Sequence, residues 1–248
     1  MAQRGIVDMI DEERLSEIIP EDVSLRLVEP HIYSLYSHGE KTSSYDRIFG
    51  AIYDLVACNR FYNRFVWGYL TTDYHSFCLD ALRSSTEGWV LDAGCGSLAF
   101  TAKTYVNYSG RPVVLLDKSI KMLMVAKSRL VKLSGKVPDN MVFLHGDILQ
   151  LPFKPKSFGT VISLNLLHVL EDVKKVLQEL RNVLMDGGTI SLTTLIEHNR
   201  FADKYLHMLG KAGKLFPRDA KQLFAVFDAL GMPVKYRIKG NLAFIGYR

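Results

Sequence analysis

The stretch VLDAGCGSLAF, residues 90–100, decides how the rest of the chain is interpreted. An apolar run leads into Asp92, and then into Gly94 and Gly96, two glycines one residue apart. Glycine permits a tight turn and lets a ligand approach the backbone, because it has no Cβ. The free N–H groups of a helix that begins after such a turn can receive an anionic group. The stretch therefore predicts a nucleotide-type site, with a helix beginning at about residue 98, and leaves the kind of nucleotide open.

Short β-branched or aliphatic runs alternate with helical patterns after residue 88. The helical patterns cover about 98–108, 119–134, 171–185 and 218–230, and the strand-like runs are Trp89–Leu91, Val113–Leu116, Val142–Leu144, Thr160–Ser163, Thr189–Thr194, Val234–Ile238 and Leu242–Tyr247. Such alternation predicts an α/β fold with a parallel sheet and helices on both faces. Only Gly240-Asn241 separates the last two runs, and a two-residue loop makes an antiparallel hairpin. We expect a Rossmann-like, mostly parallel sheet of seven strands with a C-terminal antiparallel hairpin.

The first third of the chain has a different pattern. Residues 1–44 predict a short helix at about 11–18 and then an irregular arm, with Pro20 and Pro30 as breakers. Apolar residues recur at helical spacing from Tyr45 to Arg83. We therefore expect an N-terminal arm and helical cap at 1–85, followed by a nucleotide-binding domain at 86–248 with a lid insertion at about 197–217.

Polar residues follow the early strand-like runs, at the edge where ligands of parallel sheets bind. Asp117 ends the second run, and one carboxylate can accept hydrogen bonds from both hydroxyls of a ribose. Gly146, Asp147 and Ile148 follow the third run, where a carboxylate and a backbone N–H suit the polar edge of adenine. Asn165 follows the fourth run. Together these positions predict one nucleoside-binding edge.

A dinucleotide site is the main alternative, because residues 94–99 also fit G-x-G-x-x-A and Asp117 lies 23 residues after Gly94. Three features count against it. Asp92 precedes the glycines, where it would repel a pyrophosphate but suits an ammonium group. The HGDI at 145–148 has no role in that fingerprint, and the C-terminal hairpin is foreign to that fold. A P-loop is excluded, since no Lys-Ser/Thr follows the glycines.

The motifs together resemble the class I S-adenosylmethionine-dependent methyltransferases. VLDAGCG, VVLLDKSIKML, VFLHGDILQLPF and SFGTVISLNLLHVLEDVKKVL carry the resemblance, which covers about residues 45–195. The chain is most similar to the type 11 branch, which includes the ubiquinone/menaquinone-biosynthesis C-methyltransferases. The resemblance implies S-adenosylmethionine as cofactor, S-adenosylhomocysteine as product, and a small, apolar or quinol-like methyl acceptor.

The resemblance also implies roles for individual residues. The glycine turn would hold the methionine part of the cofactor, Asp117 its ribose, and Asp147 its adenine. The cofactor-binding residues implied are Tyr45, Asp92, Ala93, Gly94, Cys95, Gly96, Asp117, Lys118, Met122, Gly146, Asp147, Ile148, Asn165 and Leu166. On the acceptor side the resemblance implies Tyr53, and from the chain's own residues we expect His198, Phe201 and Tyr205, with His168 and His198 as candidate catalytic bases. Two positions depart from the family: Leu98 stands where a third glycine is common, and Gly159 where Asp is usual.

Charge is distributed unevenly along the chain. The net charge is +5, and residues 198–248 hold ten Lys or Arg against three Asp. A basic amphipathic segment at 200–214 is able to rest on a membrane surface or to line an apolar pocket. The basic third also keeps an RNA or protein methyltransferase as an alternative, although its aromatic residues are not interleaved with the basic ones as stacking platforms. We therefore expect no stable nucleic-acid partner. A non-catalytic cofactor-binding module is the other alternative.

The cysteine content and the N-terminal segment bear on metal binding and location. Cys58, Cys78 and Cys95 form no CxxC pair, so we expect no metal site and a reducing compartment. The acidic N-terminal segment lacks the apolar core of a secretory signal. We expect a cytoplasmic enzyme, and the oligomeric state stays open, a homodimer included.

Overall fold

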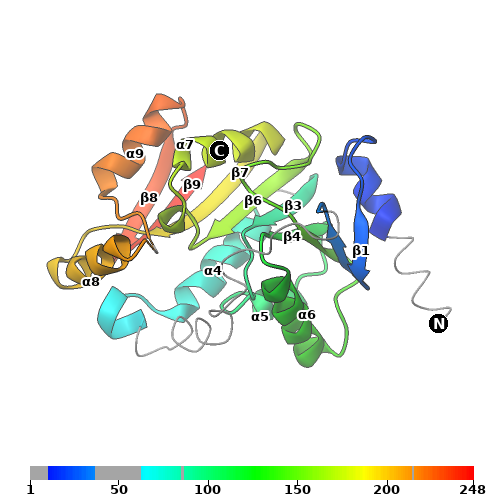
Figure 1. The fold of residues 1–248 in the computed structure, drawn as a ribbon, viewed down its shortest axis with the longest axis horizontal. Coiled ribbons are helices and arrows are strands. Elements are labelled where there is room, and N and C mark those ends of the chain that lie inside the picture. The colour runs from blue at the N-terminus through cyan, green and yellow to red at the C-terminus, as the bar shows by residue number, and fades with distance from the viewer. Residues whose placement is uncertain (1–10, 37–62, 85–86, 214) are drawn as a thin grey trace.

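The computed structural model describes residues 11–36, 63–84, 87–213 and 215–248. These residues build one mixed sheet of nine strands with helices on both of its faces (Figure 1). The strands are β1 (Arg26–Glu29), β2 (Ile32–Ser34), β3 (Trp89–Ala93), β4 (Val113–Asp117), β5 (Met141–His145), β6 (Phe158–Leu164), β7 (Leu184–Leu195), β8 (Val234–Lys239) and β9 (Leu242–Tyr247). The predicted α/β class is confirmed.

The seven predicted strands correspond to β3 through β9. The sheet order is β1-β2-β5-β4-β3-β6-β7-β9-β8, so the strand that carries the glycine turn lies at the centre. β3 pairs in parallel with both β4 and β6, which brings their carboxyl ends to one edge. β8 and β9 form the predicted antiparallel hairpin, and β9 is antiparallel to β7.

The sheet differs from the prediction at its N-terminal edge. Residues 11–18 are helical as expected, but the segment that follows contains the hairpin β1–β2 instead of an irregular arm. β2 pairs in parallel with β5, which raises the strand count from seven to nine. Strands of four and three residues are too short to show period-2 alternation, so the sequence pattern did not reveal them.

Amphipathic helices cover the two faces of the sheet. α4 (Thr71–Leu82), α5 (Ala102–Val106) and α6 (Ile120–Ser134) pack on one face, and α7 (Val173–Val183) and α9 (Ala220–Ala229) on the other. α7 illustrates how the helices cover the sheet. Its apolar residues Val173, Val176, Leu177 and Leu180 recur at helical spacing, and all four are buried. The first part of the expected helical cap, residues 45–62, lies outside the residues that the structure describes. The described part of residues 45–83 comprises a π-helical turn η2 (Asn63–Trp67) and α4, which packs beside β6 and β7.

The helix after the glycine turn is shorter than predicted. The expected helix covers about 98–108, whereas α5 is limited to Ala102–Val106 and turns occupy residues 96–101. Leu98 explains the difference, because its φ of 54° is left-handed and incompatible with a right-handed helix. Leu98 is nevertheless buried in the core beneath α5 and α6. Its apolar side chain is therefore held by packing in a backbone conformation that usually selects glycine.

Candidate active site

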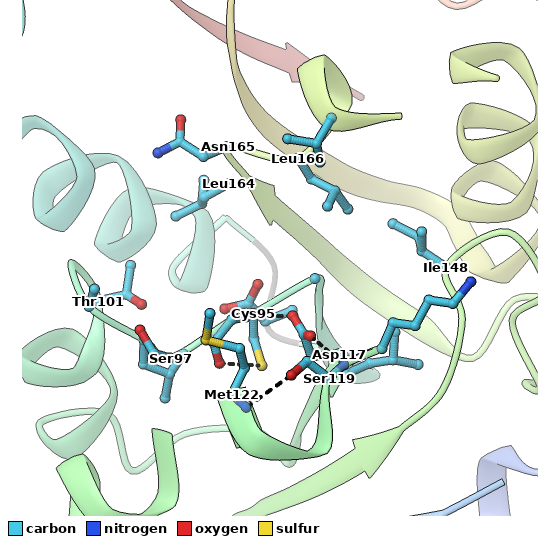
Figure 2. A pocket seen from close by; sticks show the side chains of 18 of the residues that line it. Cys95, Ser97, Thr101, Asp117, Ser119, Met122, Ile148, Leu164, Asn165 and Leu166 are labelled. Carbon is cyan, nitrogen blue, oxygen red and sulfur yellow. Dashed lines mark hydrogen bonds between the residues drawn. The ribbon is translucent and has the colours of Figure 1, made fainter. Parts of the chain in front are cut away.

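A cavity of about 250 Å³ opens at the carboxyl ends of β3, β4, β5 and β6. Figure 2 shows Asp117, Ser119 and Met122 along one side of it, and Leu164, Asn165 and Leu166 along the other. Most of the sequence-predicted cofactor residues line this one cavity: Asp92, Gly94, Cys95, Gly96, Asp117, Lys118, Met122, Asp147, Ile148, Asn165 and Leu166. The structure thus brings together side chains from four strand ends.

The two glycines of the turn are required for different reasons. Gly94 has a φ of 78°, and a Cβ added to it would lie 2.6 Å from Cδ2 of Leu166. Gly96 has a φ of 55°, and its own added Cβ would meet no atom within 4 Å. Gly94 therefore permits close packing across the cavity. Gly96 leaves open space on the cavity side of the turn, where a ligand can approach the backbone.

Asp92 is buried below the glycine turn. Its Oδ2 accepts a hydrogen bond from the Tyr105 hydroxyl at 2.7 Å, while Oδ1 has no hydrogen-bond partner within the described part of the chain. Burial, reinforced by the charge of Asp117, raises the pKa of Asp92 to about 7, although the Tyr105 hydrogen bond opposes the shift. A buried, unpartnered carboxylate oxygen in a cavity wall is a site prepared for a cationic donor.

Asp117 and Asp147 form the second polar side of the cavity. Asp117 Oδ2 accepts from the Gly96 N–H at 2.8 Å, and its Oδ1 accepts from the Ser119 N–H at 2.8 Å. These bonds fix the carboxylate at the end of β4. Asp147 is ion-paired with Lys118 and also accepts from the Leu149 N–H at 3.0 Å. Because each carboxylate oxygen can accept two hydrogen bonds, the arrangement suits the hydroxyls and exocyclic amine of a nucleoside.

The remaining wall is apolar and includes residues that sequence reasoning missed. Asn165 follows β6 with a φ of 57°, and its Oδ1 accepts from the Tyr74 hydroxyl at 2.7 Å. The Tyr74 ring stacks on Phe100, with centroids 4.8 Å apart. Phe100 lines the cavity together with Leu164, Leu166, Val169 and Leu170. The sequence does not single out Tyr74 and Phe100 as site residues, because aromatic residues at helical or turn positions are typical of an ordinary hydrophobic core.

Two predicted cofactor residues lie outside the cavity lining. Ala93 is buried at the end of β3, and its carbonyl accepts from the Ser163 hydroxyl at 2.7 Å. Gly146 faces the N-terminal hairpin: a Cβ added to it would lie 2.6 Å from Cδ1 of Leu35. Gly146 is therefore needed for the close approach of Leu35, a contact that the sequence pattern did not reveal.

His168 is buried beside β7 and is not part of the cavity lining. Its Nδ1 accepts from the Leu195 backbone N–H at 3.3 Å and lies 3.2 Å from Thr194 Oγ1. Burial and the nearby Arg218 guanidinium lower the pKa of His168 to about 3. Since Nδ1 accepts a hydrogen bond and the side chain does not line the cavity, this geometry places no free nitrogen lone pair of His168 in the cavity.

The three predicted acceptor-side residues that the structure describes, His198, Phe201 and Tyr205, are not among those that line the cavity. Phe201, on α8 (Arg200–Lys211), is 79% exposed, and Tyr205 packs on Trp67 with ring centroids 5.7 Å apart. The His198 N–H donates to Asp203 Oδ1 at 3.0 Å before the helix begins. Tyr45 and Tyr53 lie outside the described residues.

Comparison with known proteins agrees with this geometry. Residues 91–192 match the family described as "Methyltransferase domain". A demethylmenaquinone methyltransferase of Lactococcus lactis is 32% identical over 141 residues, covering 54% of each chain. A malonyl-[acyl-carrier protein] O-methyltransferase of Hamiltonella defensa is 32% identical over 109 residues, covering 44% of this chain and 38% of that protein. The chain thus matches about half, or less, of the length of these relatives.

A solved structure shows the same fold at low identity. Geranyl diphosphate C-methyltransferase from Streptomyces coelicolor, in complex with S-adenosyl-L-homocysteine, superposes with a TM-score of 0.58 at 12% identity, covering 72% of this chain and 75% of that chain. The cavity is compatible with such a cofactor, because the buried Asp92 Oδ1 has no hydrogen-bond partner among the described residues and Gly96 leaves room beside the backbone. The family match and these relatives support a class I S-adenosylmethionine-dependent methyltransferase, with the matched methyltransferase domain at residues 91–192.

Proposed function

We propose that this protein transfers a methyl group from S-adenosylmethionine to a small, apolar or quinol-like acceptor. The observation that carries the proposal is the unpartnered Oδ1 of Asp92, which lies below the glycine turn in a cavity whose far wall is apolar. A cationic amino group is the natural partner of that oxygen. An apolar wall favours an acceptor with a hydrophobic ring or chain.

Different residues of the chain would bind different parts of the cofactor. Asp92 would bind the ammonium group, and Asp117 the ribose hydroxyls. Asp147 and the Ile148 backbone N–H would bind the adenine edge, with Met122 against its face. When bound, the cofactor supplies an electrophilic methyl group on a sulfonium. The main contribution of the protein is then alignment of the acceptor, which is worth roughly 7–11 kcal/mol in well-oriented reactions.

The acceptor must bring its own nucleophilic atom. Among the described residues, the charged members of the cavity lining are Asp92, Asp117, Lys118 and Asp147, and each of them is assigned above to a part of the cofactor. Within the described residues the lining contains no histidine, and His168 is hydrogen-bonded to β7. We therefore assign His168 a packing role. An activated carbon of a quinol or enol, or an acceptor that is already ionised, meets this requirement.

Ligand-induced stabilisation tests the proposal. S-adenosylmethionine, S-adenosylhomocysteine and NADH are added separately, and the unfolding midpoint is measured. A ligand at about 100 times its Kd stabilises a protein by about 2.7 kcal/mol, so the two sulfur ligands should raise the midpoint. A shift with NADH alone would refute the proposal.

Accumulation of S-adenosylhomocysteine is then followed with a demethylquinol, a malonyl thioester, RNA and a protein extract. Product with RNA or protein alone favours the rival enzyme class, and no product with any of them favours a non-catalytic module.

We further propose that α8 forms a lid that contacts an anionic lipid surface. The segment leaves and re-enters the fold at one point, because the Glu197 N–H donates to the Arg218 carbonyl at 2.9 Å. Phe201 and Met208 are 79% and 55% exposed on α8, and exposed Lys204 lies between them. Exposed aromatic and basic side chains on one helix suit a headgroup region. Among the described residues, no helix is long and apolar enough to cross a bilayer.

Vesicle sedimentation tests the lid proposal. Binding to phosphatidylglycerol vesicles, but not to phosphatidylcholine vesicles, is the expected result, and Phe201→Ser with Met208→Ser should weaken it. Equal sedimentation of the double variant and the unsubstituted protein would rule out this surface.

A further inference from the structure

The β1–β2 hairpin ends directly beside the nucleoside side of the cavity. β2 runs parallel to β5, with Ser34 opposite His145, and the Leu35 N–H donates to the His145 carbonyl at 3.1 Å. Gly146 follows the last residue of β5 and packs closely against the Leu35 side chain, and Asp147 comes next in the sequence. The end of the hairpin therefore supports the strand end that presents Asp147 to the cavity.

His145 connects this hairpin to the end of β4. Its Nε2 lies 3.1 Å from the Lys118 carbonyl oxygen, and its Nδ1 lies 3.0 Å from Ser34 Oγ. A carbonyl oxygen can only accept, so Nε2 carries the proton and Nδ1 accepts from the Ser34 hydroxyl. The Tyr36 ring also meets the imidazole edge-on, with centroids 4.8 Å apart. His145 is thus fixed by β2, by Tyr36 and by the backbone of Lys118.

Both loops that His145 touches present cavity residues. Lys118 follows β4 and Asp147 follows β5, and their side chains form an ion pair at the cavity. The hydrogen bond from His145 to the Lys118 carbonyl holds the Lys118 backbone against the strand that leads to Asp147. The separation of the two loops sets the width of the space in which a nucleoside would lie.

We infer that His145 is a positioning residue for the adenosine end of the cofactor, acting through the Lys118 carbonyl and supported by the β1–β2 hairpin. The inference rests on the proposed function. It assigns the N-terminal hairpin, which lies outside the matched methyltransferase region, a direct part in cofactor affinity. It also separates cofactor affinity from turnover, because His145 does not line the cavity.

Two substitutions of His145 distinguish its hydrogen bond from its bulk. His145→Asn keeps a polar atom near the Nδ1 position but cannot reach the Lys118 carbonyl. His145→Gln places an N–H donor near the Nε2 position. For His145→Asn we expect the Kd of S-adenosylhomocysteine and of 5′-methylthioadenosine to rise about tenfold, with kcat at saturating cofactor unchanged. His145→Gln should restore both affinities to within about twofold of the unsubstituted protein.

His31→Asn is the matched control. His31 lies at the turn of the same hairpin, where its Nδ1 is 2.9 Å from Asp11 Oδ2, and its φ of 69° is one that asparagine tolerates. This variant should lower the unfolding midpoint and leave both affinities unchanged. Unchanged affinities in His145→Asn, or equal losses in His145→Asn and His145→Gln, would overturn the inference. Failure of the unsubstituted protein to bind S-adenosylhomocysteine is a different result, which overturns the proposed function.

Discussion

Tyr74 donates its hydroxyl proton to the side-chain oxygen of Asn165, and this 2.7 Å bond links α4 to the end of β6. The bond orients an asparagine that follows the strand in left-handed backbone geometry. Because a side-chain amide oxygen held by a hydroxyl leaves the amide nitrogen as the remaining donor, Tyr74 sets which group Asn165 can offer to the cavity.

Tyr74→Phe should therefore affect the acceptor step more than cofactor binding. Loss of one hydrogen bond costs about 0.5–1.5 kcal/mol, so we expect kcat/KM for the acceptor to fall about 2- to 13-fold. Steady-state kinetics with the identified acceptor, and calorimetry with S-adenosylhomocysteine, check this. Tyr69→Phe is the control, because the Tyr69 hydroxyl bonds to Asn63 at 3.0 Å, away from Asn165. A larger loss of cofactor affinity than of kcat/KM in Tyr74→Phe would contradict the assignment.

Asp92→Asn should weaken cofactor binding selectively at the amino-acid end. Replacing the carboxylate removes a charge-assisted hydrogen bond worth about 1.5–3 kcal/mol, which corresponds to about a 10- to 150-fold rise in Kd for S-adenosylhomocysteine. 5′-Methylthioadenosine has no ammonium group, so its Kd should stay the same. Isothermal titration with both ligands makes the comparison, and equal losses for both would show that Asp92 acts on the turn rather than on the ammonium.

The raised pKa of Asp92 predicts opposite pH trends for stability and for binding. Its pKa is about 7 in the folded chain against an ordinary value of 3.8, so the ligand-free fold binds the proton more tightly than the unfolded chain. The contribution of Asp92 to the free energy of unfolding therefore falls as pH rises between about 4 and 7. An ammonium ligand needs the carboxylate, so cofactor affinity should rise over the upper part of that range, by up to about tenfold per pH unit.

Urea denaturation and calorimetry between pH 5.5 and pH 7 measure the two trends. Asp92→Asn serves as the reference, because it cannot titrate at this position. If the cofactor affinity of the unsubstituted protein changes with pH as little as that of the variant, the carboxylate is already ionised without ligand and the prediction is wrong.

The buried, left-handed Leu98 predicts an unusual order of stability for its alanine and glycine variants. Its side chain is 1% exposed, so truncation to alanine should cost about 2–5 kcal/mol. The left-handed φ of 54° costs a non-glycine residue about 1–2 kcal/mol, a strain that Leu98→Ala keeps and Leu98→Gly removes. Leu98→Gly should therefore be more stable than Leu98→Ala, the reverse of the usual order. Chemical denaturation of both variants tests this, and the usual order would mean that the turn relaxes in Leu98→Ala.

The central part of the fold was predictable because its signals are local. β3 through β6 carry continuous apolar runs, and Asp92, Asp117 and Asp147 stand at strand ends that a parallel sheet must bring together. Whether a predicted side chain reaches the cavity depends on contacts distant in sequence. His168 looks the same in sequence whether it faces a cavity or, as here, accepts a bond from Leu195.

Other features of the site that the sequence did not reveal also depend on contacts or backbone angles that a local pattern does not show. The glycine at position 146 matches the family motif, but its close neighbour is Leu35, 111 residues earlier in the chain. The early end of the predicted helix at 98–108 depends on a φ angle that no periodicity reveals. Tyr74 acts through a hydroxyl bond to a residue 91 positions away.

The β1–β2 hairpin also determines what the sheet exposes to other molecules. Without it, β5, with the apolar sequence MVFLH, would present a row of unpaired backbone donors and acceptors, a template for strand pairing between copies. β1 is poorly suited to that role: it is four residues long, begins with Arg26, ends with Glu29, and is irregular in register. The hairpin thus replaces an aggregation-prone edge with a short, charged one at this side of the sheet.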